Sequence, residues 1–324
     1  MMVVYTGTAL ISHLPVYSVC YAFNYKAKLY LMFSSIKQRI RRRLLGNRFQ
    51  QRLVDDHDTL GRLGNRHYFH HHEKFLAHGF QPPINAYEFS HYSQNGEDGL
   101  ILHLLARIGV KYHYIVEVGT EDGRECNSAN LILNFGWRAC LVEAAEHWAV
   151  KARQYFADCK VTDRIQILNA KASPENINDL LREAGVQKDI DILSIDIDSH
   201  DYWLWEAIDD VNPRIIVIEY NASFGPSRSI TVPYPIPAPG LSNPYYHGAS
   251  ITAMNKLAER KGYQLVGCDS KGVNSFFVRS DLATKAGLTV MEPAQAYRSH
   301  FRRNRKRNDA EQYAAIVNLP LTEI

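Results

Sequence analysis

The chain has 324 residues, of which 46% are apolar and 22% charged, an ordinary globular composition in a chain long enough to bury its own core. This composition excludes a disordered protein, a collagen-like repeat and a disulfide scaffold. Five scattered cysteines, none of them spaced C-x-x-C, predict free thiols in a reducing, cytoplasmic compartment and argue against a zinc knuckle.

The net charge of +3 is unevenly distributed. Nine Lys and Arg residues without an acid lie between Lys26 and Arg52, and six more lie between Arg298 and Arg307. Without these fifteen, the chain has 22 basic and 34 acidic residues. An acidic body is a poor surface for nucleic acid, but it suits a cationic cofactor or a metal ion. We interpret the two basic stretches as solvated helix faces or tails.

Sequence patterns divide the chain into four parts. Residues 1–31 are expected to form a loosely ordered extension, with a helix packed on the body as the alternative, and no apolar segment is long enough to span a bilayer. Residues 32–92 are expected to be helical and basic. Their histidine cluster at 67–72 is interpreted as a solvated loop or helix end rather than a metal site. Residues 93–280 form the main domain, and residues 281–324 a helical, basic tail.

Strands and helices alternate through the main domain. A helix with a capping-type start opens at 93–98, and seven strand-type runs follow, most of them separated by helical segments. This alternation predicts an α/β, Rossmann-like fold with a mostly parallel sheet. A turn containing Gly272 separates the last two runs, so we expect them to form an antiparallel C-terminal hairpin. The seven runs are Tyr114–Val118, Ala139–Glu143, Ile165–Asn169, Ile190–Ile195, Ile215–Glu219, Tyr263–Cys268 and Ser275–Arg279.

The first strand runs into a glycine-containing acidic loop. Gly119 and Gly123 let the backbone approach a ligand closely, as in dinucleotide-binding folds. The loop lacks the G-x-G-x-x-G pattern and instead carries Glu117, Glu121 and Asp122. Three carboxylates disfavour a pyrophosphate and favour a cation, such as the sulfonium of S-adenosylmethionine.

The second strand ends at Glu143. An acid at this position is placed to accept hydrogen bonds from both ribose hydroxyls of an adenosine. Together with the loop after the first strand, Glu143 predicts a binding site for an adenosine-containing cofactor.

Polar residues also follow the fourth and fifth strands. Asp196 and Asp198 come after one strand, and Glu219 and Asn221 come at the end of the next. These oxygen-rich side chains predict either a Mg²⁺ site or a metal-free active site. We favour the metal-free interpretation, because the spacing only partly matches that of metal-dependent enzymes.

A reaction at a hydroxyl group needs a residue that takes up a proton. Asp196, Asp198 and His200 are the candidate catalytic residues, and His247 in a later loop is a further candidate base. A single histidine in a loop is more often a hydrogen-bonding or surface residue.

Several motifs occur in a fixed order along the chain. They are Ser93-Gln-x-Gly-Glu-Asp-Gly, Glu117-Val-Gly-x-x-Asp-Gly, Cys126-Asn-x-x-Asn-Leu, Leu193-Ser-Ile-Asp-Ile-Asp-x-x-Asp-Tyr-Trp, Val217-Ile-Glu-Tyr-Asn, Gly248-Ala-Ser and Lys261-Gly-Tyr-x-Leu-Val-Gly. As an ordered set, this resembles a bacterial group of S-adenosylmethionine-dependent methyltransferases related to the FkbM-like family. The sequence departs from the pattern at Glu121 and Ser199, where glycine is common.

The resemblance implies a class I methyltransferase domain over residues 93–280. It also implies hydroxyl methylation, often of sugars, and so a role in polysaccharide modification. The implied cofactor-binding residues are Gln94, Glu117, Gly119, Asp122, Gly123 and Glu143.

We therefore predict a cytoplasmic S-adenosylmethionine-dependent O-methyltransferase that acts on a hydroxylated small molecule or a glycan, without a nucleic-acid partner. The Pro-rich segment Thr231–Pro244 is expected to lie over the pocket and select the acceptor. One alternative is a Rossmann enzyme linked to NAD or a nucleotide sugar. The other is a catalytically silent binding module that retains the fold.

Overall fold

The computed structural model describes residues 83–236 and 242–324. The predicted extension 1–31 and most of the predicted basic region 32–92 lie outside the described residues. Within the described part, no helix has both the length and the apolar character needed to cross a bilayer. The cysteines described, Cys126, Cys140, Cys159 and Cys268, all carry free thiols, as predicted.

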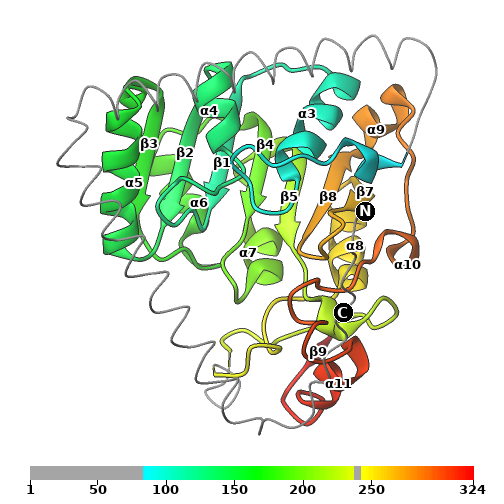
Figure 1. Cartoon of the computed structure of the whole chain (residues 1–324). Helices are drawn as coiled ribbons and strands as arrows, with labels where there is room; N and C mark the ends of the chain where they lie inside the picture. Colours follow the sequence, from blue (N-terminus) through cyan, green and yellow to red (C-terminus); the bar gives the residue numbers. More distant parts are fainter. Residues whose placement is uncertain (1–82, 237–241) are drawn as a thin grey trace, which may run out of the picture. The chain divides into compact units, whose positions relative to one another are not determined.

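A seven-stranded sheet forms the centre of the domain, in the order β3-β2-β1-β4-β5-β8-β7 (Figure 1). Strands β1 to β5 pair in parallel, whereas β8 is antiparallel to both β5 and β7. This confirms the predicted Rossmann-like sheet with its antiparallel C-terminal hairpin. The strands are β1 (Tyr114–Val118), β2 (Arg138–Glu143), β3 (Ile165–Asn169), β4 (Asp189–Ile195), β5 (Asn212–Glu219), β7 (Tyr263–Cys268) and β8 (Asn274–Arg279).

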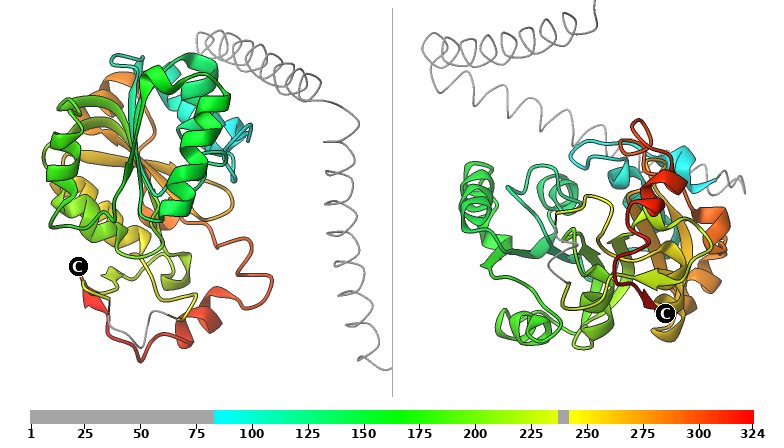
Figure 2. Two further views of the ribbon diagram at one scale, coloured as in Figure 1. Left: turned by 90° about the vertical axis from the view of Figure 1, so that its left-hand side faces the viewer. Right: turned by 90° about the horizontal axis from the view of Figure 1, so that it is seen from below.

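Helices cover both faces of the sheet (Figure 2). Side chains alternate along each strand, so that Ile192 packs with one helix layer while Leu193 packs with the other. Because both faces are buried, the central strands are almost continuously apolar. One layer contains α3 (Glu97–Ile108), α4 (Ala129–Phe135), α5 (Glu146–Asp158) and α9 (Ser280–Ala286), and the other contains α6 (Ile177–Glu183), α7 (Asp201–Ala207) and α8 (Ile251–Arg260).

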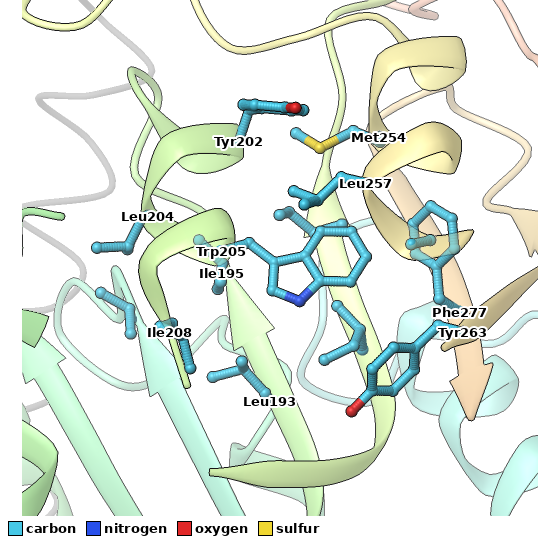
Figure 3. Packing of buried hydrophobic residues seen from close by; sticks show 14 of the residues in the cluster. Leu193, Ile195, Tyr202, Leu204, Trp205, Ile208, Met254, Leu257, Tyr263 and Phe277 are labelled. Carbon is cyan, nitrogen blue, oxygen red and sulfur yellow. The ribbon is translucent and has the colours of Figure 1, made fainter. Parts of the chain in front are cut away.

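Trp205 anchors helix α7 to the sheet (Figure 3). Its side chain is 2% exposed, and its ring lies 5.3 Å from the ring of Phe277 and 6.1 Å from that of Tyr263. Leu193 of β4 and Leu257 of α8 belong to the same cluster. This packing holds α7 against the sheet, and α7 directly follows the loop that carries Asp196 and Asp198.

The C-terminal residues fold back onto the domain (Figure 1). After α10 (Pro293–Ala296) and α11 (Asp309–Ala314), strand β9 (Thr322–Glu323) pairs antiparallel with β6 (Ile230–Thr231). Ile316 is fully buried in a small cluster with Phe224 and Tyr246. The last part of the chain, with Ile316 and β9, is therefore tied to the region that follows β5, close to the carboxyl ends of the strands.

Candidate functional site

A cavity of about 710 Å³ lies at the carboxyl ends of β1, β2, β4 and β5. The chain proceeds from β1 towards β3 on one side of the sheet and from β4 towards β5 on the other. The loops after β1 and β4 therefore diverge, which is where open α/β sheets bind ligands. Of the predicted site residues, those on the wall are Gln94, Glu117, Gly119, Asp122, Glu143, Asp196, Asp198, His200 and Glu219.

The two glycines of the first loop have different surroundings. Gly119 has φ +89°, and a Cβ atom there would lie 1.7 Å from the carbonyl oxygen of Asp196. Gly123 has φ +75°, and a Cβ atom there would lie 2.6 Å from the ring of Phe156. Gly119 thus permits close contact between the β1 and β4 loops. Gly123 packs against α5 rather than lining the cavity, so its prediction as a cofactor residue finds no support in its position.

Glu117 is 2% exposed and holds the loop after β1 in place. Its carboxylate accepts hydrogen bonds from the backbone N–H groups of Asn127 (2.9 Å) and Ser128 (2.8 Å). Burial raises the pKa of Glu117. Both oxygens therefore have a structural partner, and a direct contact between Glu117 and a cofactor stays a prediction.

Glu143 ends β2 and is 7% exposed. Its two carboxylate oxygens accept hydrogen bonds from the N–H groups of Glu121 and Ala145, each at 2.8 Å. A carboxylate oxygen accepts more than one hydrogen bond, so acceptor capacity remains for a ligand. Trp148 and Ala170 line the cavity nearby and give this end an apolar part.

Glu121 adopts a backbone conformation that favours glycine, with φ +47°. This explains in physical terms why glycine suits the position. Partial burial, followed by the charges of Asp122 and Glu143, raises the pKa of the Glu121 carboxyl.

The loop between β4 and α7 holds three aspartates with different environments. Asp201 is fully buried and accepts hydrogen bonds from the N–H groups of Ile197 (2.9 Å) and Ser199 (3.2 Å). Asp198 is exposed on the cavity wall with φ +55°. Burial, and then the charges of Asp201 and Asp198, raises the pKa of Asp196 well above its ordinary value. The Asp196 carboxyl therefore holds its proton more tightly than an ordinary aspartate does.

His200 is buried in the cavity wall, and both of its ring nitrogens have partners. Nδ1 lies 2.9 Å from Oγ of Ser199, and Nε2 lies 3.4 Å from the carbonyl oxygen of Ala172. The ring of Tyr234, from the predicted acceptor-selecting segment, lies 5.0 Å away. Burial lowers the pKa of His200, so the ring is neutral at neutral pH. These contacts suit a positioning role at least as well as a base.

Glu219 and His247 are buried together beside the cavity, at 5% and 7% exposure. Nδ1 of His247 lies 3.8 Å from Oε2 of Glu219, which is too long for a hydrogen bond. Among the residues described, neither ring nitrogen of His247 nor Oε2 of Glu219 has a hydrogen-bond partner. Burial lowers the pKa of His247 to about 3. Burial, and then the charge of Asp196, raises the pKa of Glu219 well above its ordinary value.

Asn221 holds a loop instead of facing the cavity. Its amide nitrogen donates to the carbonyl oxygens of Tyr245 and His247, each at 2.8 Å. Its amide oxygen accepts from the N–H of Ser223 and from the guanidinium of Arg303. Because both ends of the amide are engaged within the protein, the structure does not support the predicted role of Asn221 as a metal ligand.

The C-terminal basic stretch contributes to the site, which the sequence did not reveal. His300, Phe301, Arg302 and Arg303 line the cavity. The side chain of Arg303 is only 17% exposed, and Nη2 lies 3.8 Å from Oε1 of Glu219. The interpretation of this stretch as purely solvated is therefore wrong for Arg303. The feature of the sequence that could have indicated this role of Arg303 is a run of cations in a chain whose remaining charges are mostly acidic.

No protein-family description and no curated protein matches this sequence. Solved structures with a similar course of the chain include an O-methyltransferase from Bacillus cereus in complex with S-adenosylhomocysteine, at 18% identity over 65% of this chain and 88% of that chain (TM-score 0.38). The O-methyltransferase TomG from Streptomyces achromogenes, in complex with S-adenosylmethionine, is 19% identical over 57% of this chain and 80% of that chain (TM-score 0.37). Fibrillarin from Aeropyrum pernix, with bound S-adenosylmethionine, is 11% identical over 52% and 67% (TM-score 0.36). At these values the function must be argued from the site itself.

Proposed function

We propose that the protein is an S-adenosylmethionine-dependent O-methyltransferase. The observation that carries this proposal is the acidic cavity at the carboxyl ends of β1, β2, β4 and β5, with Glu143 at the end of β2. The acceptor is a hydroxylated small molecule or a glycan, and the reaction takes place in the cytoplasm. The ordered motifs that resemble the FkbM-like group support the same activity.

The wall of the cavity fits the two ends of S-adenosylmethionine. Glu143 would accept the ribose hydroxyls, and the apolar surface near Trp148 suits an adenine ring. Glu121 and Asp122, together with Asp196, surround the part of the cavity next to Gly119. Their negative charges favour a sulfonium and an ammonium group.

When bound, the cofactor supplies a methyl group activated by the positive charge on sulfur. The chain's part is to align an acceptor hydroxyl with that methyl group and to receive the proton. Glu143 and the acidic wall of the cavity would hold the cofactor, whose sulfur would keep the electron pair of the carbon–sulfur bond when the methyl carbon bonds to the acceptor oxygen. We propose Asp196 as the group that takes the hydroxyl proton, because it lines the cavity and because burial and neighbouring charges raise its proton affinity. Asp198 and His200 line the same wall as alternative acceptors.

An enzyme linked to NAD or a nucleotide sugar fits the cavity less well. A pyrophosphate normally rests on the N-terminus of the helix that directly follows the first strand. Here α4 begins only at Ala129, and the intervening loop places Glu121, Asp122 and Glu125 on the cavity wall. These carboxylates would repel a pyrophosphate.

Isothermal titration calorimetry with the full chain tests the cofactor. S-adenosylmethionine and S-adenosylhomocysteine are expected to bind, whereas NAD⁺ at the same concentration is not. Binding of NAD⁺ alone would overturn the proposal in favour of the alternative. Cofactor binding without turnover across a screen of hydroxylated acceptors would instead favour the catalytically silent module.

A further inference from the structure

Asp198, Glu219 and His247 bring three potential metal ligands together from three separate segments of the chain. One oxygen or nitrogen atom from each lies within 4.8 Å of those of the other two. Asp198 is exposed on the cavity wall, while Glu219 and His247 are buried. The group thus has one side chain on the cavity wall and two in the buried interior.

Buried polar atoms of two of these three residues lack hydrogen-bond partners within the described part of the chain. A buried polar atom without a hydrogen bond costs roughly 1–3 kcal/mol, so native proteins rarely leave one unsatisfied. Here three such atoms occur side by side, namely Oε2 of Glu219 and both ring nitrogens of His247, counted over the residues described. Nη2 of Arg303 lies 3.8 Å from the other carboxylate oxygen, Oε1 of Glu219. Oε2 is therefore left for a different cation.

The distance between one pair of these atoms is near that of two ligands of a shared ion. Two ligand atoms about 2.1 Å from one metal ion lie roughly 3.0–3.6 Å apart for bond angles of about 90–120°. The 3.8 Å between Nδ1 of His247 and Oε2 of Glu219 is close to this range, although it is too long for a hydrogen bond.

The three segments are tied to each other by backbone hydrogen bonds. The N–H of Gly248, next to His247, donates to the carbonyl oxygen of Ser199, next to Asp198 (2.6 Å). The N–H of Asn221 donates to the carbonyl oxygen of Ala249 (2.7 Å). The three ligand side chains are therefore held near one another before any ligand binds, as a built metal site requires.

We propose that Asp198, Glu219 and His247 bind one divalent transition-metal ion. Two carboxylates and one imidazole favour Mn²⁺ or a similar ion over Mg²⁺, which prefers oxygen ligands alone. Three protein ligands leave coordination positions open towards the cavity. The catalytic role rests on the proposed function: the ion would bind the acceptor oxygen and lower the pKa of its hydroxyl.

The metal-stripped full chain is titrated with Mn²⁺, and the electron paramagnetic resonance signal of free Mn²⁺ reports how much of the ion stays unbound. This experiment tests the site without any cofactor. Wild type is expected to bind Mn²⁺, and Asp198→Asn and His247→Ala to bind it at least about tenfold more weakly. Asp198 is exposed, so its variant should fold normally even where replacement of the buried histidine disturbs the core. Unchanged Mn²⁺ affinity in Asp198→Asn would overturn the proposal.

Two controls make the assignment specific. His300→Ala removes another histidine from the cavity wall and should bind Mn²⁺ like wild type, and an equal loss there would overturn the choice of ligands. His70, His71 and His72 are replaced together by Gln in a second control, and a loss of Mn²⁺ binding in that variant would place the ion elsewhere. Calorimetry with S-adenosylmethionine on the same samples reports separately on the proposed function, because Glu143, the proposed ribose contact, is not one of the three proposed metal ligands.

Discussion

The side-chain amide of Asn221 donates a hydrogen bond of 2.8 Å to the carbonyl oxygen of His247. Asn221 is fully buried just beyond the end of β5, and its second amide hydrogen goes to the carbonyl oxygen of Tyr245. A residue with two donors can hold two carbonyls of one loop at once. The end of β5 thereby determines where His247 lies relative to Glu219.

Replacing Asn221 with Ala should destabilise the protein by roughly 2–4 kcal/mol, because the buried carbonyl oxygen of His247 and the part-buried one of Tyr245 lose their donor. Urea unfolding followed by circular dichroism measures the change in the free energy of unfolding. Asn255→Ala on the surface of α8 is the matched control, since its amide donates only to the exposed Glu259 side chain. Equal effects of the two substitutions would contradict the anchoring role of Asn221.

A comparison of Gly119 with Gly185 separates the energetic cost of atomic crowding from that of backbone strain. Both have a positive φ, at +89° and +68°, but a Cβ atom on Gly119 would collide with the Asp196 carbonyl while one on Gly185 would meet no atom within 4 Å. Gly185→Ala should cost about 1–2 kcal/mol for the left-handed conformation alone. Gly119→Ala should cost roughly 1–3 kcal/mol more. Thermal and urea unfolding of both variants measure this difference, and similar losses would show that the loops after β1 and β4 can separate.

Much of the fold could be predicted from the sequence because it depends on local patterns. The runs Tyr114–Val118, Ile165–Asn169 and Tyr263–Cys268 are strands with the predicted bounds. Their apolar, β-branched and aromatic residues fit a buried sheet, and polar residues and glycines separate them. The short β6 and β9 carried no such pattern, because each is two residues long and exists only through pairing between distant segments.

The site could be predicted only in part, for a related reason. Asp196 and Glu219 could be located because a strand end places its side chain at the edge of the sheet. The pairing of His247 with Glu219, and of Arg303 with the same carboxylate, depends on how long loops return to the sheet. The sequence contains no periodic signal for such contacts. Asn221 does lie just beyond the end of β5, as the sequence indicates. Its amide, however, forms hydrogen bonds within the protein, which the sequence does not show.

Glu143→Ala tests the cofactor site. Loss of a charged acceptor at the ribose should cost about 1.5–3 kcal/mol of binding free energy, which weakens S-adenosylmethionine binding roughly ten- to a hundredfold. Isothermal titration calorimetry measures the dissociation constant. Glu146→Ala, which removes an exposed carboxylate three residues further along, is the control and should bind the cofactor like wild type. If the two variants bind alike, the adenosine site lies elsewhere.

Asp98 is buried at the start of α3. One of its oxygens, Oδ2, accepts hydrogen bonds from the backbone N–H groups of His91 (2.8 Å), Tyr92 (2.7 Å) and Ser93 (2.9 Å). Burial nevertheless outweighs these bonds and raises the pKa of Asp98 to about 6 from an ordinary value of 3.8. The folded protein therefore binds this proton more tightly than the unfolded chain does.

Asp98→Asn should therefore change how stability depends on pH. The contribution of the Asp98 proton is fully present below about pH 3.8 and is lost as the pH rises through about 6. An Asn side chain can still accept the three N–H groups, but it carries no titrating proton. Relative to the variant, wild type should thus lose roughly 2–3 kcal/mol between pH 4 and pH 7. Urea unfolding of both proteins across this range measures the difference in the free energy of unfolding at each pH. Parallel curves for the two proteins would show that burial does not raise the pKa of Asp98.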